Sequence, residues 1–329
     1  MKKIVFSLVL TLFAAFMNAQ ESQTSYNFLR LPVSAHAAAL GGDNITLIED
    51  DEALVFHNPA LLSSVSDKTI NLNYMNYMSG VNAASASFNR IVKEKATWAV
   101  SAQYIDYGKM KQTDENNIEM GEFSAKDIAL AGHFSYMLAR NLAGGISARF
   151  ITSYIGDYNS IAMGVDLGLN YYDPEQDLSI SAVAKNLGGQ LKAYDEEYEK
   201  MPIDLQVGAT KRFENTPFRI SATLVNLNHW DSGLKNHLVA GAELLLGESL
   251  WLGAGYNARR ADEMTISTGE ENEESSHGAG WSFGGGINLE RFQLNVAYGK
   301  YHASSNSLVL SVNYKLEIIN CTLLIIHYK

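Results

Sequence analysis

The chain has 329 residues, of which 47% are hydrophobic and only 19% are charged, and its formal net charge is −11. A single cysteine excludes a disulfide scaffold, and an acidic chain without a cluster of Lys and Arg disfavours nucleic acid as a ligand. Only one long apolar run precedes the last residues, whereas a bundle of membrane helices needs several runs of about 20 residues, so that class is excluded as well.

Residues 1–19 have the pattern of an export signal. Lys2 and Lys3 precede an apolar stretch of roughly 14 residues, which is too short to span a bilayer comfortably. Small residues follow, and we predict cleavage after Ala19. The alternative is an N-terminal membrane anchor. The signal implies that the mature chain is exported. We divide the mature chain into a segment 20–66, a domain 67–316 and a tail 317–329.

Residues 67–316 alternate between apolar and small or polar side chains. In 161–171 the odd positions are Ile, Met, Val, Leu, Leu and Tyr, and the even positions are Ala, Gly, Asp, Gly and Asn. About fourteen such segments, most of about 10 to 14 residues, exceed the usual soluble strand of 5 or 6 residues and suit a tilted strand that crosses a bilayer. The pattern predicts an all-β fold, a transmembrane antiparallel barrel of about 14 strands.

The connections between these segments differ at the two ends of the predicted barrel. Those at one end are short, as at 92–95, 140–141 and 173–176, and several at the other end are long and polar, namely 108–124, 189–201, 230–235 and 260–279. This asymmetry is typical of outer-membrane barrels, and an even strand number places both barrel ends in the periplasm. A large soluble sandwich or solenoid is the alternative. Aromatic residues near strand ends, including Trp251 and Tyr301, predict interfacial girdles.

The segment 20–66 is apolar and punctuated by glycine, which is unsuited to free disorder, and we expect it to fold into the lumen as a plug or hatch. It contains Ala-Ala-Leu-Gly-Gly, then Asp-Asp, then Asn-Pro-Ala-x-Leu. This arrangement resembles the N-terminal hatch of FadL-like outer-membrane barrels, and 28–47 resembles the PorV/PorQ branch of that superfamily, which serves the type IX secretion system. The hatch motif residues are Leu40, Gly41, Gly42, Asp50, Asp51, Asn58, Pro59 and Ala60. His36 stands where this family is expected to have arginine, which weakens the case for a lumenal ion pair at that position.

The resemblance implies a non-enzymatic role in the outer membrane of Bacteroidota. Barrels of this branch are thought to hold a PorZ-like protein at the cell surface, beside the PorU sortase and the PorV shuttle, where cargo is joined to lipopolysaccharide. The implied partners are therefore a PorZ-like protein, PorU- and PorV-like proteins, outer-membrane lipid and lipopolysaccharide. The alternative is a FadL-like transporter of a hydrophobic small molecule, which needs an apolar lumenal pocket and a lateral opening in the wall.

The sequence contains little that indicates catalysis or a bound cofactor. No metalloprotease or hydrolase motif occurs, and one cysteine cannot form a multi-cysteine zinc site, so we expect no catalytic residue, no cofactor and no metal. His133 near Ser135 could belong to a catalytic group, but a lumen-facing or girdle histidine is the more common reason for such a residue. Asp50, Asp51 and Glu52 could bind a cation or cap turns, and we favour capping.

Two long connections carry most of the clustered acidic residues. They are Asp195, Glu196, Glu197 and Glu199 in one connection, and Asp262, Glu263, Glu270, Glu271, Glu273 and Glu274 in the other. Solvated loops explain such clusters most simply. Docking of a basic partner surface and weak Ca²⁺ binding are the functional alternatives.

Overall fold

The computed structural model describes residues 24–78, 80–230, 233–247, 249–264, 266–267, 274–275, 278–302 and 305–316. The predicted signal 1–19 and the tail 317–329 with Cys321 lie outside these residues, as do Glu270, Glu271 and Glu273. Among the described residues, no helix is both long enough and apolar enough to cross a membrane.

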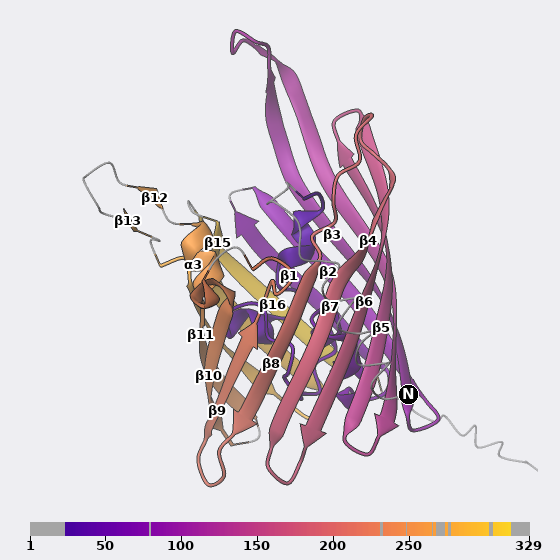
Figure 1. Cartoon of the computed structure of the whole chain (residues 1–329), viewed down its shortest axis with the longest axis vertical. Helices are drawn as coiled ribbons and strands as arrows, with labels where there is room; N and C mark the ends of the chain where they lie inside the picture. Colours follow the sequence, from indigo (N-terminus) through magenta and orange to yellow (C-terminus); the bar gives the residue numbers. More distant parts are fainter. Residues whose placement is uncertain are drawn as a thin grey trace, which may run out of the picture.

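Fourteen antiparallel strands close into a barrel, as predicted (Figure 1). Each strand pairs with its neighbour in the chain, and β1 closes the barrel on β16 with Thr69 opposite Lys315. The barrel strands are β1 Thr69–Met78, β2 Val81–Val92, β3 Ala96–Thr113, β4 Glu119–Ala139, β5 Leu142–Ile155, β6 Tyr158–Asp173, β7 Leu178–Lys192, β8 Asp204–Arg212, β9 Phe218–Leu224, β10 Leu238–Leu246, β11 Leu250–Asn257, β14 Trp281–Asn288, β15 Phe292–His302 and β16 Ser305–Lys315.

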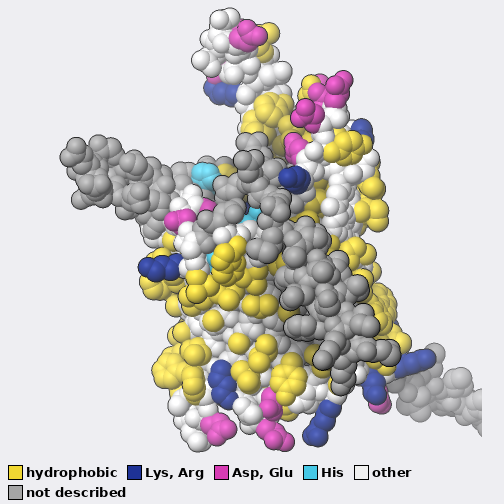
Figure 2. Space-filling model, in the orientation of Figure 1, with side chains coloured by type: hydrophobic (Ala, Val, Ile, Leu, Met, Phe, Trp, Pro, Cys, Tyr) yellow, Lys and Arg dark blue, Asp and Glu magenta, His cyan; other side chains and the backbone are white. Residues whose placement is uncertain are grey.

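The alternation in the sequence becomes an apolar outer face and a more polar inner face. In β6 the side chains of Met163, Leu167 and Leu169 are about half exposed on the outside, while Asp166 and Asn170 are buried on the inside. Figure 2 shows hydrophobic side chains spread over the outer wall, with charged side chains gathered toward the ends of the barrel. The wall therefore has the surface that contact with lipid requires.

Two predicted details of the barrel are wrong. The connection predicted at 108–124 is mostly strand, because β3 continues to Thr113 and β4 begins at Glu119. In this stretch the two strands no longer pair with β2 and β5, and they pair only with each other. We call residues 109–122 the ribbon; it rises above the rest of the molecule in Figure 1. The connection predicted at 260–279 does lie between β11 and β14. Its described residues include the end of α3 (Ala258–Glu263) and the short pair β12 (Ile266–Ser267) and β13 (Glu274–Ser275).

The second error concerns two predicted girdle aromatics. Trp251 and Tyr301 face the lumen and are 2% and 8% exposed, respectively. The flanking residues of Trp251, Leu250 and Leu252, occupy the outer face instead. Strand parity, rather than proximity to a strand end, sets the direction of an aromatic side chain.

Residues 24–66, the described part of the N-terminal segment, lie inside the barrel and pack against opposite parts of its wall (Figure 1). The segment contains η1 (Asn27–Arg30), α2 (Ala35–Ala39), η2 (Glu52–Phe56) and η3 (Pro59–Ser64), while η4 (Leu234–His237) lies between β9 and β10. Helix α2 contacts β11, β14, β15 and β16, and η3 contacts β3, β4, β5 and β6. The largest hydrophobic clusters combine side chains of this segment with inward-facing residues of the strands.

Candidate functional site in the barrel lumen

Helix α2 is anchored to the wall through its backbone. Ser34 caps its N-terminus by accepting a hydrogen bond from the Ala37 amide, and Leu40 and Gly41 follow its last turn. The Gly41 amide donates to the Ser282 hydroxyl at 3.0 Å. Gly41 has a φ of +104°, and a Cβ added there would lie 2.4 Å from Cγ1 of Val239. Both the turn and the close approach to β10 therefore require glycine at this position.

The Asp50-Asp51-Glu52 group caps and ties turns. The Asp51 carboxylate accepts hydrogen bonds from the Ala53 amide at 3.0 Å and from Asn313 of β16 at 2.8 Å. Asp50 accepts from the Ser66 amide at 2.7 Å and pairs with Lys315 at 2.5 Å. Among the described residues, no group of three or more His, Cys, Asp or Glu side chains is arranged to hold a metal ion. The contacts therefore match the capping interpretation.

Burial changes the ionisation of this group. The Glu52 side chain is fully buried and receives one hydrogen bond, from the Ser87 hydroxyl at 2.5 Å. Desolvation raises the pKa of Glu52 to about 8 and also raises the pKa of Asp51. Glu52 is accordingly a neutral carboxylic acid over most of the neutral pH range.

The Asn-Pro-Ala part of the motif fits against two glycines of the wall. Asn58 accepts a hydrogen bond from the Ala60 amide at 2.9 Å, which begins η3 with Pro59 in its first turn. A Cβ added to Gly168 of β6 would lie 2.1 Å from Oδ1 of Asn58, and one added to Gly145 of β5 would lie 2.3 Å from the Ala60 nitrogen. These glycines leave the space that the motif occupies.

A buried charged network links the segment to β9 and β10. Nε2 of His36 lies 2.5 Å from Oε1 of Glu243, and the His36 ring stacks on Trp251 with ring centroids 3.7 Å apart. Arg219 binds Glu243 through two nitrogens, at 2.7 and 3.0 Å, and binds Glu49 at 2.6 Å. Histidine at position 36 therefore still contacts a lumenal carboxylate, which is the one that Arg219 binds.

His133 hydrogen-bonds to two serines, neither of which is Ser135. Its ring nitrogens hydrogen-bond to the Ser101 and Ser147 hydroxyls at 2.8 and 2.7 Å, whereas the Ser135 hydroxyl donates to the Ala60 carbonyl. A catalytic base requires an orienting partner and a nucleophile. Two serine partners on neighbouring strands match the interpretation of His133 as a lumen-facing histidine.

The acidic clusters are not brought together at one described site. Asp195, Glu196, Glu197 and Glu199 are exposed in the connection between β7 and β8. Asp262 and Glu263 lie in α3, where Asn236 and Arg259 bind them at 2.7 Å each. Glu274 is in β13, and the other three glutamates lie outside the described residues.

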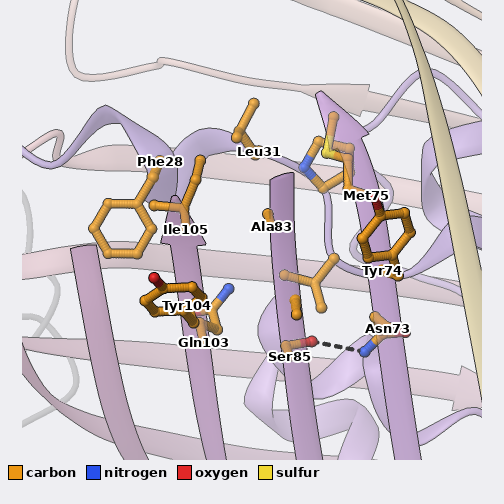
Figure 3. Close-up of a pocket in the computed structure, with 13 residues that line it drawn as sticks. Phe28, Leu31, Asn73, Tyr74, Met75, Ala83, Ser85, Gln103, Tyr104 and Ile105 are labelled. Atoms are coloured by element: carbon orange, nitrogen blue, oxygen red, sulfur yellow. Dashed lines mark hydrogen bonds between the residues drawn. The ribbon is translucent and has the colours of Figure 1, made fainter. Parts of the chain in front are cut away.

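An apolar pocket lies between the N-terminal segment and strands β1 to β3 (Figure 3). Its cavity volume, measured as the space open to the centre of a water-sized molecule, is about 30 Å³, within about 380 Å³ of non-atom space that includes open solvent. Phe28, Leu31, Met75 and Ile105 supply most of the apolar lining, and Asn73 donates to Ser85 at 2.9 Å across the base shown in the figure. We did not predict this pocket, although the run Ala-Ala-Ser-Ala-Ser at 83–87 indicates a strand without bulky side chains.

The pocket has lining residues from both faces of the wall. Asn73, Ala83 and Gln103 belong to the inward-facing set, whereas Tyr74, Ala84 and Tyr104 belong to the outward-facing set. Because side chains alternate along a strand, both sets can contact one pocket only where the wall is thin. The small residues of β2 provide that thin place.

Comparison with known proteins gives a match in structure but none in sequence. No protein-family model and no curated protein matches the chain. The Ralstonia pickettii toluene transporter TbuX has a TM-score of 0.58 at 11% identity, covering 88% of this chain and 100% of its own. The Pseudomonas putida toluene transporter TodX has 0.55 at 14%, covering 86% and 98%, and a Pseudomonas aeruginosa FadL homologue has 0.52 at 10%, covering 88% and 99%.

The chain shares the fold of FadL-like barrels. Identities this low establish the fold and nothing finer, so the predicted architecture is confirmed and membership of the PorV/PorQ branch stays a prediction. The match covers nearly the full length of the structures compared.

Proposed function

We propose that this chain is a non-enzymatic outer-membrane channel for a small hydrophobic molecule. The observation that carries the proposal is the apolar pocket between Phe28, Leu31 and the thin wall at β2. The structural neighbours include proteins described as toluene transporters and a monoaromatic hydrocarbon channel. Exposed large apolar side chains are spread over the outer wall of this chain. A molecule of that class gains free energy by leaving water for such a lining.

In this proposal the N-terminal segment is the plug of the channel. Its elements contact opposite parts of the wall, and Ala35, Ala37 and Ala39 are fully buried against the strands. The pocket lies where the segment meets β1, β2 and β3, so a ligand there touches the plug and the thin wall together. The thin wall is the place from which a hydrophobic ligand would pass sideways into lipid.

The test is toluene uptake into proteoliposomes that contain the full chain. Ala83→Phe places a ring in the pocket and should slow uptake at least severalfold, because the ring occupies the space that the ligand needs. Ala102→Phe adds the same ring on the exposed outer face of β3 and is the matched control. Uptake no faster than in protein-free vesicles, or equal uptake by Ala83→Phe and the wild type, contradicts the proposal.

A second candidate is the secretion-complex role, in which the barrel holds a PorZ-like protein at the surface with PorU- and PorV-like proteins. The observation that favours it is the ribbon, where Ile118 and Met120 are 59% and 68% exposed. Exposed apolar side chains beyond the barrel are suited to protein contact. Affinity capture from outer membranes, followed by mass spectrometry, tests it: PorZ- and PorU-like proteins should co-purify, and their absence together with bound hydrocarbon supports the channel instead.

A further inference from the structure

A second pocket lies in the lumen on the other side of residues 29–33. Its cavity volume, measured as the space open to the centre of a water-sized molecule, is about 10 Å³, within about 300 Å³ of non-atom space that includes open solvent. It shares Leu31, Val33 and Gln103 with the apolar pocket. Its remaining lining is largely polar and cationic. The charged and polar lining residues are Arg30, Asp43, His57, Gln103, Arg149 and Lys185.

His57 presents an N–H to this pocket. Burial lowers the pKa of His57 well below its usual value, so the ring is neutral at physiological pH. The Ser34 amide donates to Nε2 at 3.4 Å, which makes Nε2 the acceptor and leaves the proton on Nδ1. Nδ1 is buried and has no hydrogen-bond partner among the described residues, and His57 as a whole is 3% exposed.

Arg149 and Lys185 present further donors. The two terminal nitrogens of Arg149 bind Asn186 and Asp166, each at 2.8 Å, but its Nε is buried without a partner in the described chain. Lys185 is 9% exposed, and the described residues offer it neither a hydrogen bond nor an ion pair. The acidic lining residue Asp43 accepts hydrogen bonds from Asn257 at 3.2 Å and Gln206 at 3.5 Å.

We propose that this pocket binds a small oxyanion of the carboxylate or phosphate class. The buried unpartnered atoms of His57 and Arg149 are both donors, and Lys185 adds an ammonium group to the lining. The carboxylates that face these cations are Asp166, on Arg149, and Asp43, which interacts with Lys185. A carboxylate brings only acceptors, and phosphate brings more acceptors than donors, so either offsets the positive charge. Water instead brings two donors of its own, which would need acceptors in the same place. Buried donors need such partners, because a donor removed from water without one is unfavourable.

The site joins the N-terminal segment to the wall. His57 follows η2 in the segment, Arg149 is on β5 and Lys185 is on β7, so one anion in the pocket contacts three separate parts of the fold. The pocket faces the lumen and not the outer surface, which favours a free anion over the headgroup of a bilayer lipid. This site is independent of the hydrocarbon channel proposed above, since its ligand has the opposite chemistry.

The test is titration of the purified full-length barrel in a non-ionic detergent with sodium phosphate and, separately, sodium acetate, at constant ionic strength. Isothermal calorimetry should show saturable binding of at least one anion, and the same anion should raise the midpoint of thermal unfolding. The stronger of the two ligands identifies the class. Absence of saturable binding of both anions to the wild type overturns the proposal without any variant.

Variants test the position of the site. Lys185→Met should weaken binding about tenfold or more, since a charge-assisted hydrogen bond is lost, and Lys185→Arg should retain binding. Lys126→Met makes the same charge change on the exposed outer face of β4 and should leave the affinity unchanged. Equal affinity of Lys185→Met and the wild type overturns the assignment. If Lys185→Met does not fold, His57→Phe removes the Nδ1 donor and should weaken binding severalfold; unchanged affinity there has the same meaning.

Discussion

His36 and Glu243 face each other in the lumen, with 2.5 Å between Nε2 of the imidazole and Oε1 of the carboxylate. His36 belongs to α2 of the N-terminal segment and Glu243 to β10 of the wall, so the contact joins two parts of the chain that are 207 residues apart. Arg219 binds the same carboxylate through two nitrogens and extends the network to Glu49 of the segment. Glu243 is thus the centre of a buried network that holds the segment against the wall.

Removing the charge at the centre of this network should destabilise the barrel. Glu243→Gln leaves Arg219 buried with only Glu49 as an anionic partner, and breaking a buried pair costs about 3–5 kcal/mol. Urea unfolding of the full chain in detergent micelles measures the loss. Glu175→Gln, in the exposed turn between β6 and β7, is the control and should change stability by less than about 0.5 kcal/mol. A similar small loss for Glu243→Gln would show that the network does not stabilise the fold.

The ionisation of Glu52 should make stability depend on pH. Its pKa is about 8 in the folded chain and near the ordinary 4.5 when unfolded, so between these values the folded state holds a proton that the unfolded state lacks. The contribution of Glu52 to the free energy of unfolding therefore falls as pH rises from 4.5 to 8, by at most about 1.4 kcal/mol per pH unit. Above pH 8 this contribution no longer changes.

Glu52→Gln separates this effect from those of other groups. The amide resembles the neutral acid and cannot ionise, so the variant should lose the part of the pH dependence that Glu52 supplies. Urea unfolding at pH 5, 6, 7 and 8 gives the comparison, and the gap in stability between variant and wild type should widen in favour of the variant as pH rises. Parallel curves for the two proteins would refute the assigned pKa.

The glycines that accept the Asn-Pro-Ala motif should not tolerate a side chain. Gly168→Ala places a Cβ 2.1 Å from Oδ1 of Asn58, and such overpacking costs about 1–3 kcal/mol. The docked segment should then be cleaved faster by protease while the strands remain protected. Gly132→Ala is the control, because no atom lies within 4 Å of its added Cβ. Equal cleavage rates in the two variants would contradict the tight fit.

The sequence allows the barrel to be predicted, but only part of the lumen. Strand number and closure follow from an alternation that each strand carries locally, as in β6. The contacts of Asn58 with Gly168 and of His36 with Glu243 depend on which strands meet the segment, and that information is not local. Trp251 shows an intermediate case, because Leu250 and Leu252 on the outer face already place it inward. The ribbon was missed because residues 109–122 have few apolar residues and no regular alternation.

Removing the ribbon should separate the two candidate functions. Deletion of 109–122 removes the partners of Phe123 and Ser124 but leaves the pairing of β3 and β4 from Asp106–Lys126 downward intact. The deleted ion pairs Lys109–Glu122 and Lys111–Glu119 are exposed and contribute little. Heat-modifiable migration on gels checks that the shortened barrel still folds.

If the chain is a hydrocarbon channel, toluene uptake should stay near that of the wild type, because the pocket residues Leu31, Met75 and Ile105 are untouched. If the chain holds a partner protein at the surface, capture of that partner should drop severalfold, since Ile118 and Met120 are lost. Lost uptake with retained folding and unchanged protein capture would contradict both roles assigned to these surfaces.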